Sequence, residues 1–512
     1  MNKRIITTLL VGCMIAGSFS FAAENTPIPV ATGATVEVQN DEVNKIALES
    51  ENEVKTEDES VVTEDVENEN PVDQSVDSVV ATEGEVTVTP AETVAEEATT
   101  VSGAVTETIP EVVVEEPQIV YNEDGYELIE KFDNARPEGL VEDLQYTGYQ
   151  NMKDYIVVLR TAVNVRKLPT TSAPVIAQRK LYQRADLLEI VRGQYFTKSN
   201  SDLWYKVTWQ EKGKTVVGYV YSKIVVKREY KFQKMYDQVN YLKDIVDNNS
   251  TAYINNYKNW SGRPPKWYGK EEDGYGVLRD QSAPGYFDLN DKANFRYLMD
   301  GYLVSILGEV DGMYKVASPN IEGVVFVPKK YVQIKNSINN LEKVIVVDRK
   351  EQNEGVFQFI DGKWHMVSFN LSTTGAPKSK HKMPTDLGYF MAMEKKPKFL
   401  YLDDETKKID GYAPYAIRFN GGAYTHGVPV VYIKITEEEI VQPEILDEEG
   451  NVIQEKIVNE KIIGFEDPGK REYLSTIGTT PRSHKCVRNY TSHAKFMYEW
   501  IEIGKSAIIV IE

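Results

Sequence analysis

The sequence of 512 residues predicts a mostly β, multidomain protein: a disordered acidic N-terminal segment, two small β-barrels, and a larger β-rich domain with a C-terminal helix. Three observations predict it. The negative charge is concentrated before residue 119, short apolar runs separated by turn residues begin near residue 155, and every histidine lies after residue 364. A chain of this length normally forms more than one domain.

Residues 1–23 are predicted to be a signal peptide. Lys3 and Arg4 precede an apolar stretch over residues 5–21, and small residues follow it. This pattern predicts secretion to the periplasm or cell wall. Two alternatives stay open, an uncleaved anchor and a lipidated Cys13. No later apolar run is long enough to span a membrane, so we expect no integral membrane domain beyond the signal.

Residues 24–118 are predicted to be a disordered acidic linker. They contain 25 Asp or Glu, two Lys and no aromatic residue, which gives a net charge of −23. Such a segment cannot bury enough apolar surface to fold, and its like charges extend it. We interpret it as a spacer, with cation or partner binding as the alternative. Residues 119–512 together carry only +1, so nothing in the folded part favours nucleic-acid binding.

Residues 152–228 are predicted to form a small β-barrel, because β-type runs alternate there with turn residues. The runs cover residues 155–159, 162–165, 204–209 and 216–221. The Ala-Val-Asn-Val-Arg-Lys-Leu-Pro segment that starts at Ala162 resembles the opening strand of bacterial Src-homology-3-like domains. The later runs resemble the strands that close that barrel.

Residues 273–336 resemble a second, weaker copy of this domain. Residues 274–279 stand where the opening strand is expected, and residues 313–316 and 323–327 echo the closing strands. Residues 229–272 are predicted to be a helical linker. Apolar residues recur in this linker at steps of three and four, which is typical of an amphipathic helix: Phe232, Met235, Val239, Leu242 and Ile245. The barrels act either as binding modules or as spacers.

Residues 340–512 are predicted to form the last domain. Strands are expected over residues 344–348, 356–360, 364–371 and 507–511, with a tight turn at Asp361 and Gly362. A helix is expected over residues 492–503, with Ser492 as its N-cap. The charged stretch over residues 437–472 is predicted to be an inserted hairpin that turns at residues 447–451.

Cys486 is the candidate nucleophile of this domain. The chain has two cysteines, and Cys13 leaves with the predicted signal peptide. A cysteine nucleophile needs a base that takes its proton, because a free thiol is only slightly ionised at neutral pH. The five histidines all lie in this domain: His365, His381, His426, His484 and His493.

The residues around Cys486 resemble the active-site signature of the L,D-transpeptidase (YkuD-type) family. The signature is carried by Thr425-His426-Gly427 and Ser483-His484-Lys485-Cys486-Val487-Arg488-Asn489. Further marks of the family occur in order at residues 344–348, 372–375 and 383–390. The resemblance covers about 170 residues.

The resemblance implies a catalytic set of Cys486, His426, His484 and Gly427. In this scheme Cys486 attacks a peptidoglycan stem peptide at the carbonyl of an L-centred residue. His426 accepts the thiol proton, the Gly427 carbonyl orients the imidazole, and His484 with nearby N–H groups stabilises the oxyanion.

The same resemblance implies a substrate-binding set of Arg488, Ser483 and Tyr424, with Arg488 receiving a substrate carboxylate. It also implies peptidoglycan stem peptides as partners and carbapenem-type compounds as possible inhibitors. No cofactor and no metal site are predicted.

Two departures from the family pattern stand out. Lys485 occupies the position of the family glycine, and His426 lies 60 positions before Cys486, where the family has about 20. The inserted hairpin accounts for the excess. His365 is interpreted as a structural residue, His381 as a loop residue that could line the cleft, and His493 as a residue that caps or begins a helix.

Four alternatives remain. Water as the acceptor would make the enzyme an L,D-carboxypeptidase. A sortase-like transpeptidase also has His before Cys, but its Thr-Leu-x-Thr-Cys run is missing. Papain-like cell-wall peptidases place Cys before His. A non-catalytic cell-wall-binding protein is the alternative of another class, since fold alone does not establish activity.

Overall fold

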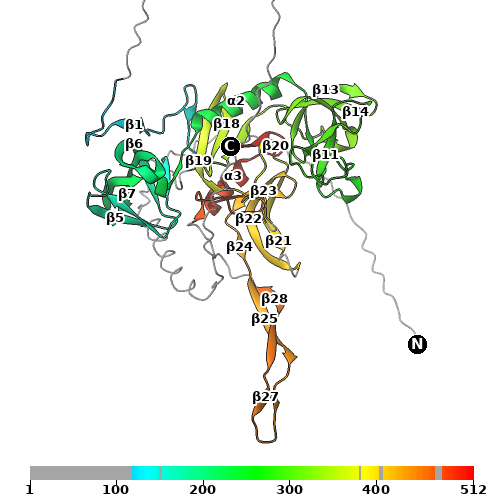
Figure 1. Cartoon of the computed structure of the whole chain (residues 1–512). Helices are drawn as coiled ribbons and strands as arrows, with labels where there is room; N and C mark the ends of the chain where they lie inside the picture. The colour runs from blue at the N-terminus through cyan, green and yellow to red at the C-terminus, as the bar shows by residue number, and fades with distance from the viewer. Residues whose placement is uncertain (1–117, 147, 149–152, 380–381, 403–406, 467–475) are drawn as a thin grey trace, which may run out of the picture. The chain divides into compact units, whose positions relative to one another are not determined.

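The computed structural model describes residues 118–146, 148, 153–379, 382–402, 407–466 and 476–512. The predicted signal peptide, the acidic linker up to residue 117, and His381 lie outside the described residues. The described chain is mostly β, as predicted, with curled sheets and two α-helices (Figure 1). No helix in the described part is long and apolar enough to cross a membrane.

The first barrel is an eight-stranded antiparallel sheet in the order β5-β4-β8-β7-β6-β3-β9, with β1 paired to β6. Its strands are β1 (Leu128–Lys131), β3 (Tyr155–Val157), β4 (Ala162–Arg166), β5 (Val175–Lys180), β6 (Arg184–Phe196), β7 (Ser201–Glu211), β8 (Lys214–Tyr221) and β9 (Val226–Arg228). In β4, Val163 and Val165 point into the core and their neighbours point outward, which is the alternation of a half-buried strand. The Src-homology-3-like assignment stays a prediction.

The second barrel is a seven-stranded sheet in the order β12-β11-β15-β14-β13-β10-β16. Its strands are β10 (Thr251–Ile254), β11 (Ser282–Tyr286), β12 (Phe295–Met299), β13 (Leu303–Val310), β14 (Met313–Ser318), β15 (Ile321–Pro328) and β16 (Val332–Gln333).

The prediction that residues 274–279 form the opening strand of this barrel is wrong. That segment forms turns, in which the Asp273 carboxylate accepts the N–H groups of Tyr275 and Val277. The strand that joins the sheet instead is β10, which lies inside the predicted linker and pairs with β13 and β16. The glycines at 274 and 276 favour this turn over a strand.

Helix α2 (Phe232–Asn248) forms the linker helix between the barrels. Four residues of the predicted apolar stripe are buried, and the fifth buried position is Val246 in place of Ile245. The stripe packs on one face of the C-terminal sheet. Short 3-10 helices lie at Thr197–Ser199, Ser222–Ile224, Trp260–Gly262 and Lys329–Tyr331.

The C-terminal domain is built on an eleven-stranded sheet in the order β20-β30-β17-β18-β19-β29-β23-β22-β21, with β2 beside β19 and β24 beside β22. Its strands are β2 (Val141–Glu142), β17 (Lys343–Asp348), β18 (Asn353–Ile360), β19 (Lys363–Thr373), β20 (Gly388–Met391), β21 (Glu394–Leu402), β22 (Ile409–Asn420), β23 (Ala423–Gly427), β24 (Val430–Val431), β29 (Val487–Asn489) and β30 (Ser506–Ile511). The predicted strands of this domain all lie within these elements.

The centre of this sheet is buried on both faces. Val344 and Val346 of β17 belong to the core that includes α2, whereas Ile345 and Val347 pack on the opposite side with residues of the second barrel. An uninterrupted apolar run is typical of a strand covered on both faces. Asp361 and Gly362 both have positive φ, so they form the predicted tight turn between β18 and β19.

The C-terminal helix α3 covers Thr491–Trp500. It begins one residue earlier and ends three residues earlier than predicted, and Ser492 is not its N-cap. The Ser492 hydroxyl instead lies 2.7 Å from the Tyr146 hydroxyl. The helix packs on the sheet through Ala494 and Met497.

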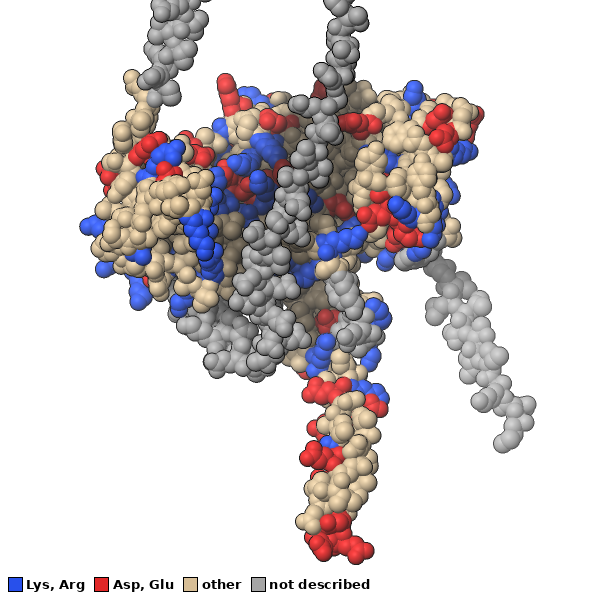
Figure 2. Space-filling view, in the orientation of Figure 1, with Lys and Arg blue, Asp and Glu red and all other residues tan. Residues whose placement is uncertain are grey.

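The predicted inserted hairpin is present. Strands β25 (Ile433–Gln442) and β28 (Ile457–Glu466) pair antiparallel, and β26 (Ile445–Leu446) pairs with β27 (Val452–Gln454) beyond them. Asp447 and Asn451 close the turn, in which Gly450 has a φ of +85°. Most of its side chains are exposed, and acidic side chains gather at its far end (Figure 2).

Removing the hairpin is expected to leave the rest of the fold intact, because its apolar side chains whose burial is described are exposed or half-buried and none of them belongs to a buried core. Residues 433–466 would be replaced by a short Gly-Ser turn, since Ile433 and Glu466 face each other at its base. Calorimetry should show a Tm within about 2 °C of the wild type.

The matched control is Ile345→Ala, which removes a fully buried side chain and should cost about 2–5 kcal/mol. A fall in Tm after hairpin removal as large as that of the control would contradict this interpretation.

Candidate functional site

A cavity of about 760 Å³ opens in the C-terminal domain at the ends of β23 and β29. Five of the predicted site residues line it: His426, Ser483, His484, Cys486 and Arg488. Apolar and aromatic side chains complete much of its wall, including Phe399, Tyr401, Val428, Pro429 and Ile477. Polar and apolar groups contribute about equally to the wall of this cavity, which suits a ligand that carries both kinds of surface.

Parallel pairing of β23 with β29 brings the thiol and the imidazole together. Thr425 pairs with Val487, and His426 pairs with Arg488. Side chains alternate between the faces of a strand, so Cys486 and Arg488 share the face on which His426 lies. His426 and Cys486 are therefore diagonal neighbours across the strand pair, although 60 positions separate them in the sequence.

Cys486 is a free, half-buried cysteine. Burial raises the pKa of its thiol above the ordinary value of 9.0. The backbone N–H of Tyr424 and the positive charges of Arg488 and Lys485 oppose this rise in pKa. Because burial dominates, the resting thiol is protonated at neutral pH, and a base must remove its proton during attack.

His426 is 3% exposed, and its Nδ1 lies 2.5 Å from the carbonyl oxygen of Gly427. Burial lowers the pKa of His426 to about 4, which the Gly427 carbonyl opposes and Arg488 reinforces. The imidazole is therefore neutral at pH 7. With Nδ1 donating to the carbonyl, Nε2 is left as the proton acceptor. This geometry matches the orienting role predicted for Gly427.

A side chain at position 427 would clash with its surroundings. A Cβ built on Gly427 would lie 2.9 Å from Cγ of Pro414 and 3.0 Å from Oγ1 of Thr491. The glycine thus allows the backbone beside His426 to approach these neighbours closely.

Arg488 is a half-buried cation on the cavity wall, and partial burial lowers the pKa of its guanidinium. Among the described residues, no carboxylate forms an ion pair with it, and its buried Nε has no hydrogen-bond partner. A partly desolvated guanidinium without an ion-pair partner favours an anionic ligand in the cavity.

The predicted oxyanion site is only partly present. His484 is exposed at the rim of the cavity. The Lys485 N–H donates to Met383 O and the Cys486 N–H to His484 O, both at 2.9 Å. The Cys486 N–H would have to leave its partner to reach an oxyanion. The Ser483 hydroxyl, predicted to bind substrate, donates to the Cys486 carbonyl and so stabilises the turn around the thiol.

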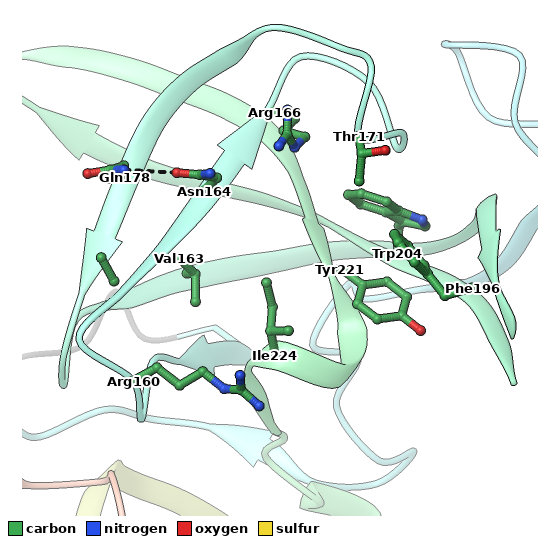
Figure 3. A pocket seen from close by; sticks show the side chains of 11 residues that line it. Arg160, Val163, Asn164, Arg166, Thr171, Gln178, Phe196, Trp204, Tyr221 and Ile224 are labelled. Atoms are coloured by element: carbon green, nitrogen blue, oxygen red, sulfur yellow. Dashed lines mark hydrogen bonds between the residues drawn. The ribbon is translucent and has the colours of Figure 1, made fainter. Parts of the chain in front are cut away.

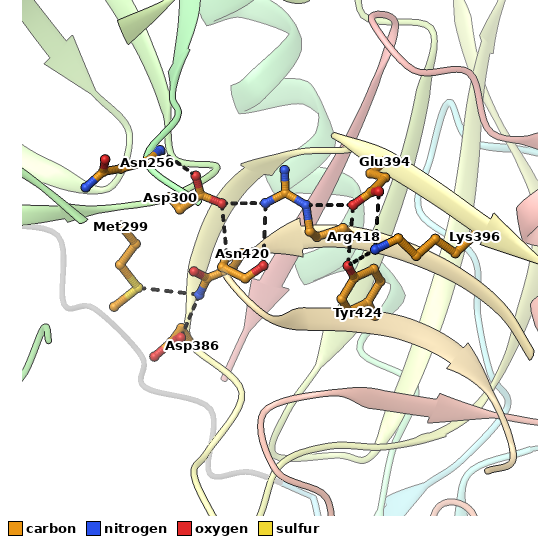
Figure 4. A network of polar contacts seen from close by, with 10 residues as sticks. Asn256, Met299, Asp300, Asp386, Glu394, Lys396, Arg418, Asn420 and Tyr424 are labelled. Carbon is orange, nitrogen blue, oxygen red and sulfur yellow. Dashed lines mark hydrogen bonds and ion pairs between the residues drawn. The ribbon is translucent and has the colours of Figure 1, made fainter. Parts of the chain in front are cut away.

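Tyr424 does not line the cavity, so its predicted substrate contact is not observed. The ring is fully buried, and its hydroxyl accepts a hydrogen bond from Lys396 Nζ at 3.1 Å and lies 3.4 Å from Glu394 (Figure 4). Glu394 also pairs with Arg418, which binds the buried Asp300 of the second barrel at 2.6 Å. The contribution of Tyr424 to the site is its backbone N–H beside the thiol.

A buried polar network on the other face of β23 and β29 was missed by the sequence interpretation. His493 Nδ1 lies 3.1 Å from Glu354, and its Nε2 lies 2.8 Å from the Ser368 hydroxyl. The Asn489 amide, with its nitrogen toward the carboxylate, donates to Glu354 at 2.9 Å and accepts from Thr425 at 2.7 Å.

This network ties β18, β29, β23 and α3 together below the cavity. His493 was predicted to cap or begin a helix, and it lies in the first turn of α3, where its side chain is fully buried. No pattern in the sequence links it to Glu354, which lies 139 positions earlier. His365, interpreted as structural, lies on β19 with Nδ1 3.7 Å from Asp143.

A second cavity, of about 450 Å³, lies on the first barrel (Figure 3). Its aromatic side is formed by Phe196, Trp204 and Tyr221. On its polar side the Gln178 amide donates to the Asn164 side chain at 2.9 Å. Arg166 lies nearby and donates to the Ala173 carbonyl at 2.8 Å. These polar groups already have partners within the barrel, so the choice between a binding module and a spacer stays open.

Together, the fold and the cavity define a β-rich protein with a thiol–imidazole site. No family model and no curated protein matches the chain. Among solved structures, it is similar to an L,D-transpeptidase from Mycobacterium smegmatis, with 16% identity over 41% of this chain and 82% of that chain, at a TM-score of 0.23. It is also similar to L,D-transpeptidase 3 from Mycobacterium tuberculosis, with 16% identity, 37% and 73% coverage, and a TM-score of 0.22.

A third similar structure is a fused Zn-dependent amidase/peptidase and peptidoglycan-binding protein from Clostridium acetobutylicum, with 18% identity and a TM-score of 0.19. The match covers 33% of this chain and about half, 51%, of that chain. At these low TM-scores the likeness does not by itself assign a family or an activity.

The rate of Cys486 alkylation by iodoacetamide should rise steadily as the pH is raised from about 6 to about 9. The thiol pKa is raised, so the fraction of reactive thiolate keeps growing over this range. Intact mass spectrometry of the chain without residues 1–23 measures the rate, and Cys486→Ser is the control for other sites. A plateau below about pH 7 would instead indicate a preformed thiolate–imidazolium pair.

Glu354→Ala should lower the free energy of unfolding by about 3–5 kcal/mol, because it leaves Nδ1 of the buried His493 without its carboxylate partner. Urea denaturation measures the change. Glu354→Gln, which keeps polar groups near His493 and Asn489, should lose less. Equal losses in the two variants would show that the polar contacts of Glu354 contribute little.

Proposed function

We propose that the chain is a cysteine-dependent L,D-transpeptidase that cross-links peptidoglycan stem peptides outside the cytoplasm. The observation that carries the proposal is the neutral imidazole of His426 beside the protonated thiol of Cys486 on one cavity wall. A nucleophile, a base and a group that orients the base are the parts that acyl transfer requires.

In the proposed acylation, Nε2 of His426 takes the thiol proton while the sulfur attacks the carbonyl carbon of the donor stem. The tetrahedral adduct then collapses, and its C–N bond breaks. The proton held by His426 passes to the amine of the leaving D-amino acid, and the donor stays on Cys486 as a thioester.

In the proposed second step, the amine of a neighbouring stem attacks the thioester. His426 takes a proton from this amine, the C–S bond breaks, and the proton returns to the sulfur of Cys486. The products are a new amide cross-link and the free thiol. Water in place of the amine would release a shortened stem, which is the carboxypeptidase alternative.

Arg488 is proposed to bind a carboxylate of the donor stem. Its guanidinium lies on the same strand face as Cys486, two positions away, and has no carboxylate partner among the described residues. A bidentate contact would pair this half-buried cation and fix the peptide relative to the sulfur. Phe399 and Tyr401 provide apolar surface on the same cavity wall.

The test uses purified disaccharide tetrapeptides and the chain without residues 1–23. The wild type should form cross-linked dimers, and Cys486→Ala should form none, as measured by chromatography with mass detection. The carbapenem imipenem should add its mass to the wild type at Cys486 and leave Cys486→Ala unmodified, because the acyl bond is to sulfur.

The control for folding is the Tm of Cys486→Ala, which should equal that of the wild type. Release of free D-amino acid without dimers would assign the carboxypeptidase activity instead. No adduct on the wild type, together with equal turnover by the two proteins, would contradict the proposal and favour a non-catalytic wall-binding protein.

A further inference from the structure

The residue before the thiol has an unusual backbone conformation. Lys485 has a φ of +66°, in the left-handed region that residues with a Cβ rarely occupy. The Cys486 N–H donates to the His484 carbonyl at 2.9 Å, so the three residues form a tight γ-turn with Lys485 at its centre. A glycine would adopt this conformation without steric strain. Lys485 therefore needs contacts that hold it there.

Two of these contacts use the backbone of Lys485. Its N–H donates to Met383 O at 2.9 Å, and its carbonyl accepts from the Thr385 hydroxyl at 2.8 Å. The Thr385 hydroxyl is fully buried and also accepts the Gly375 N–H at 2.8 Å. Any residue at position 485 could form these backbone contacts, including glycine.

The third contact uses the side chain. Nζ of Lys485 lies 2.7 Å from Oδ2 of Asp386, and the two side chains are 22% and 16% exposed. The same carboxylate oxygen accepts from the buried Asn420 amide at 2.6 Å, which holds Asp386 to the end of β22 (Figure 4). Asp386 therefore anchors the Lys485 side chain to the sheet. Only a long cationic side chain at 485 can use this anchor.

We propose that Asp386 is a positioning residue for the thiol: through Lys485, it holds the γ-turn in the left-handed conformation that places Cys486 toward the cavity. This inference rests on the proposed function. It explains how a residue other than glycine keeps the left-handed backbone conformation beside the proposed nucleophile. The lysine and the aspartate form one unit, in which the ion pair replaces the conformational freedom of glycine.

The main rival role for Lys485 is electrostatic. Its charge favours the thiolate of Cys486, and the Asp386 carboxylate offsets part of that charge. The two roles predict opposite effects of removing Asp386 on the rate of the thiol reaction. Removing the carboxylate exposes the full charge of Lys485 and speeds the thiol reaction if the role is electrostatic. It releases the turn and slows the reaction if the role is positioning.

The experiment measures the second-order rate of Cys486 acylation by imipenem in four proteins: the wild type, Asp386→Ala, Lys485→Gly and the double variant. Asp386→Ala should slow acylation about tenfold in the wild-type background, because the left-handed turn loses its side-chain anchor. When Asp386→Ala is added to Lys485→Gly, the acylation rate should change less than about twofold, because glycine adopts the turn without the ion pair.

The Asn420 contact is lost equally in both backgrounds, so it cancels in the comparison. If Asp386→Ala does not fold by circular dichroism, Asp386→Asn replaces it, which keeps a polar group beside Asn420 but removes the charge. Equal slowing in the two backgrounds, or faster acylation of Asp386→Ala, would overturn the inference. Failure of the wild type itself to be acylated would instead contradict the proposed function.

Discussion

The parallel pairing of β23 with β29 is the constraint on which the site depends. It places His426 across from Arg488 and diagonal to Cys486, on one face of the sheet. On the opposite face, Thr425 and Asn489 join the buried network of Glu354 and His493. The strand pair thus separates two kinds of polar group: those that face the cavity, and those that hold the strands together inside the core. A long insertion between the strands leaves this pairing intact because its two ends meet.

Burial determines the charge state of the site. It raises the pKa of the Cys486 thiol and lowers the pKa of His426 to about 4, so both groups are neutral at rest. Arg488 keeps its positive charge beside them. Arg488 forms no ion pair with a carboxylate among the described residues, so it favours an anionic ligand, although the Asp410 carboxyl group also lines the cavity. In the proposed mechanism, charge separation between sulfur and imidazole arises only during attack, close to the bound substrate.

Local patterns predicted much of the C-terminal domain. The apolar run at residues 344–348, the Asp361-Gly362 turn and the hairpin turn at residues 447–451 are all present, because each depends on neighbouring residues. The opening strand of the second barrel was misplaced at residues 274–279. Strand β10 is short and has no distinctive pattern, and only its pairing with β13 and β16 defines it.

The sequence by itself determined the chemistry that is available: one thiol in the C-terminal domain, five imidazoles in the same domain, and an arginine two positions beyond the thiol. The tertiary structure decided which groups can act. It brought His426 to Cys486, exposed His484, turned the Tyr424 ring away from the cavity and buried His493 against Glu354. It also paired Lys485 with Asp386. Contacts between residues far apart in the chain depend on strand register and burial, and no local pattern encodes them.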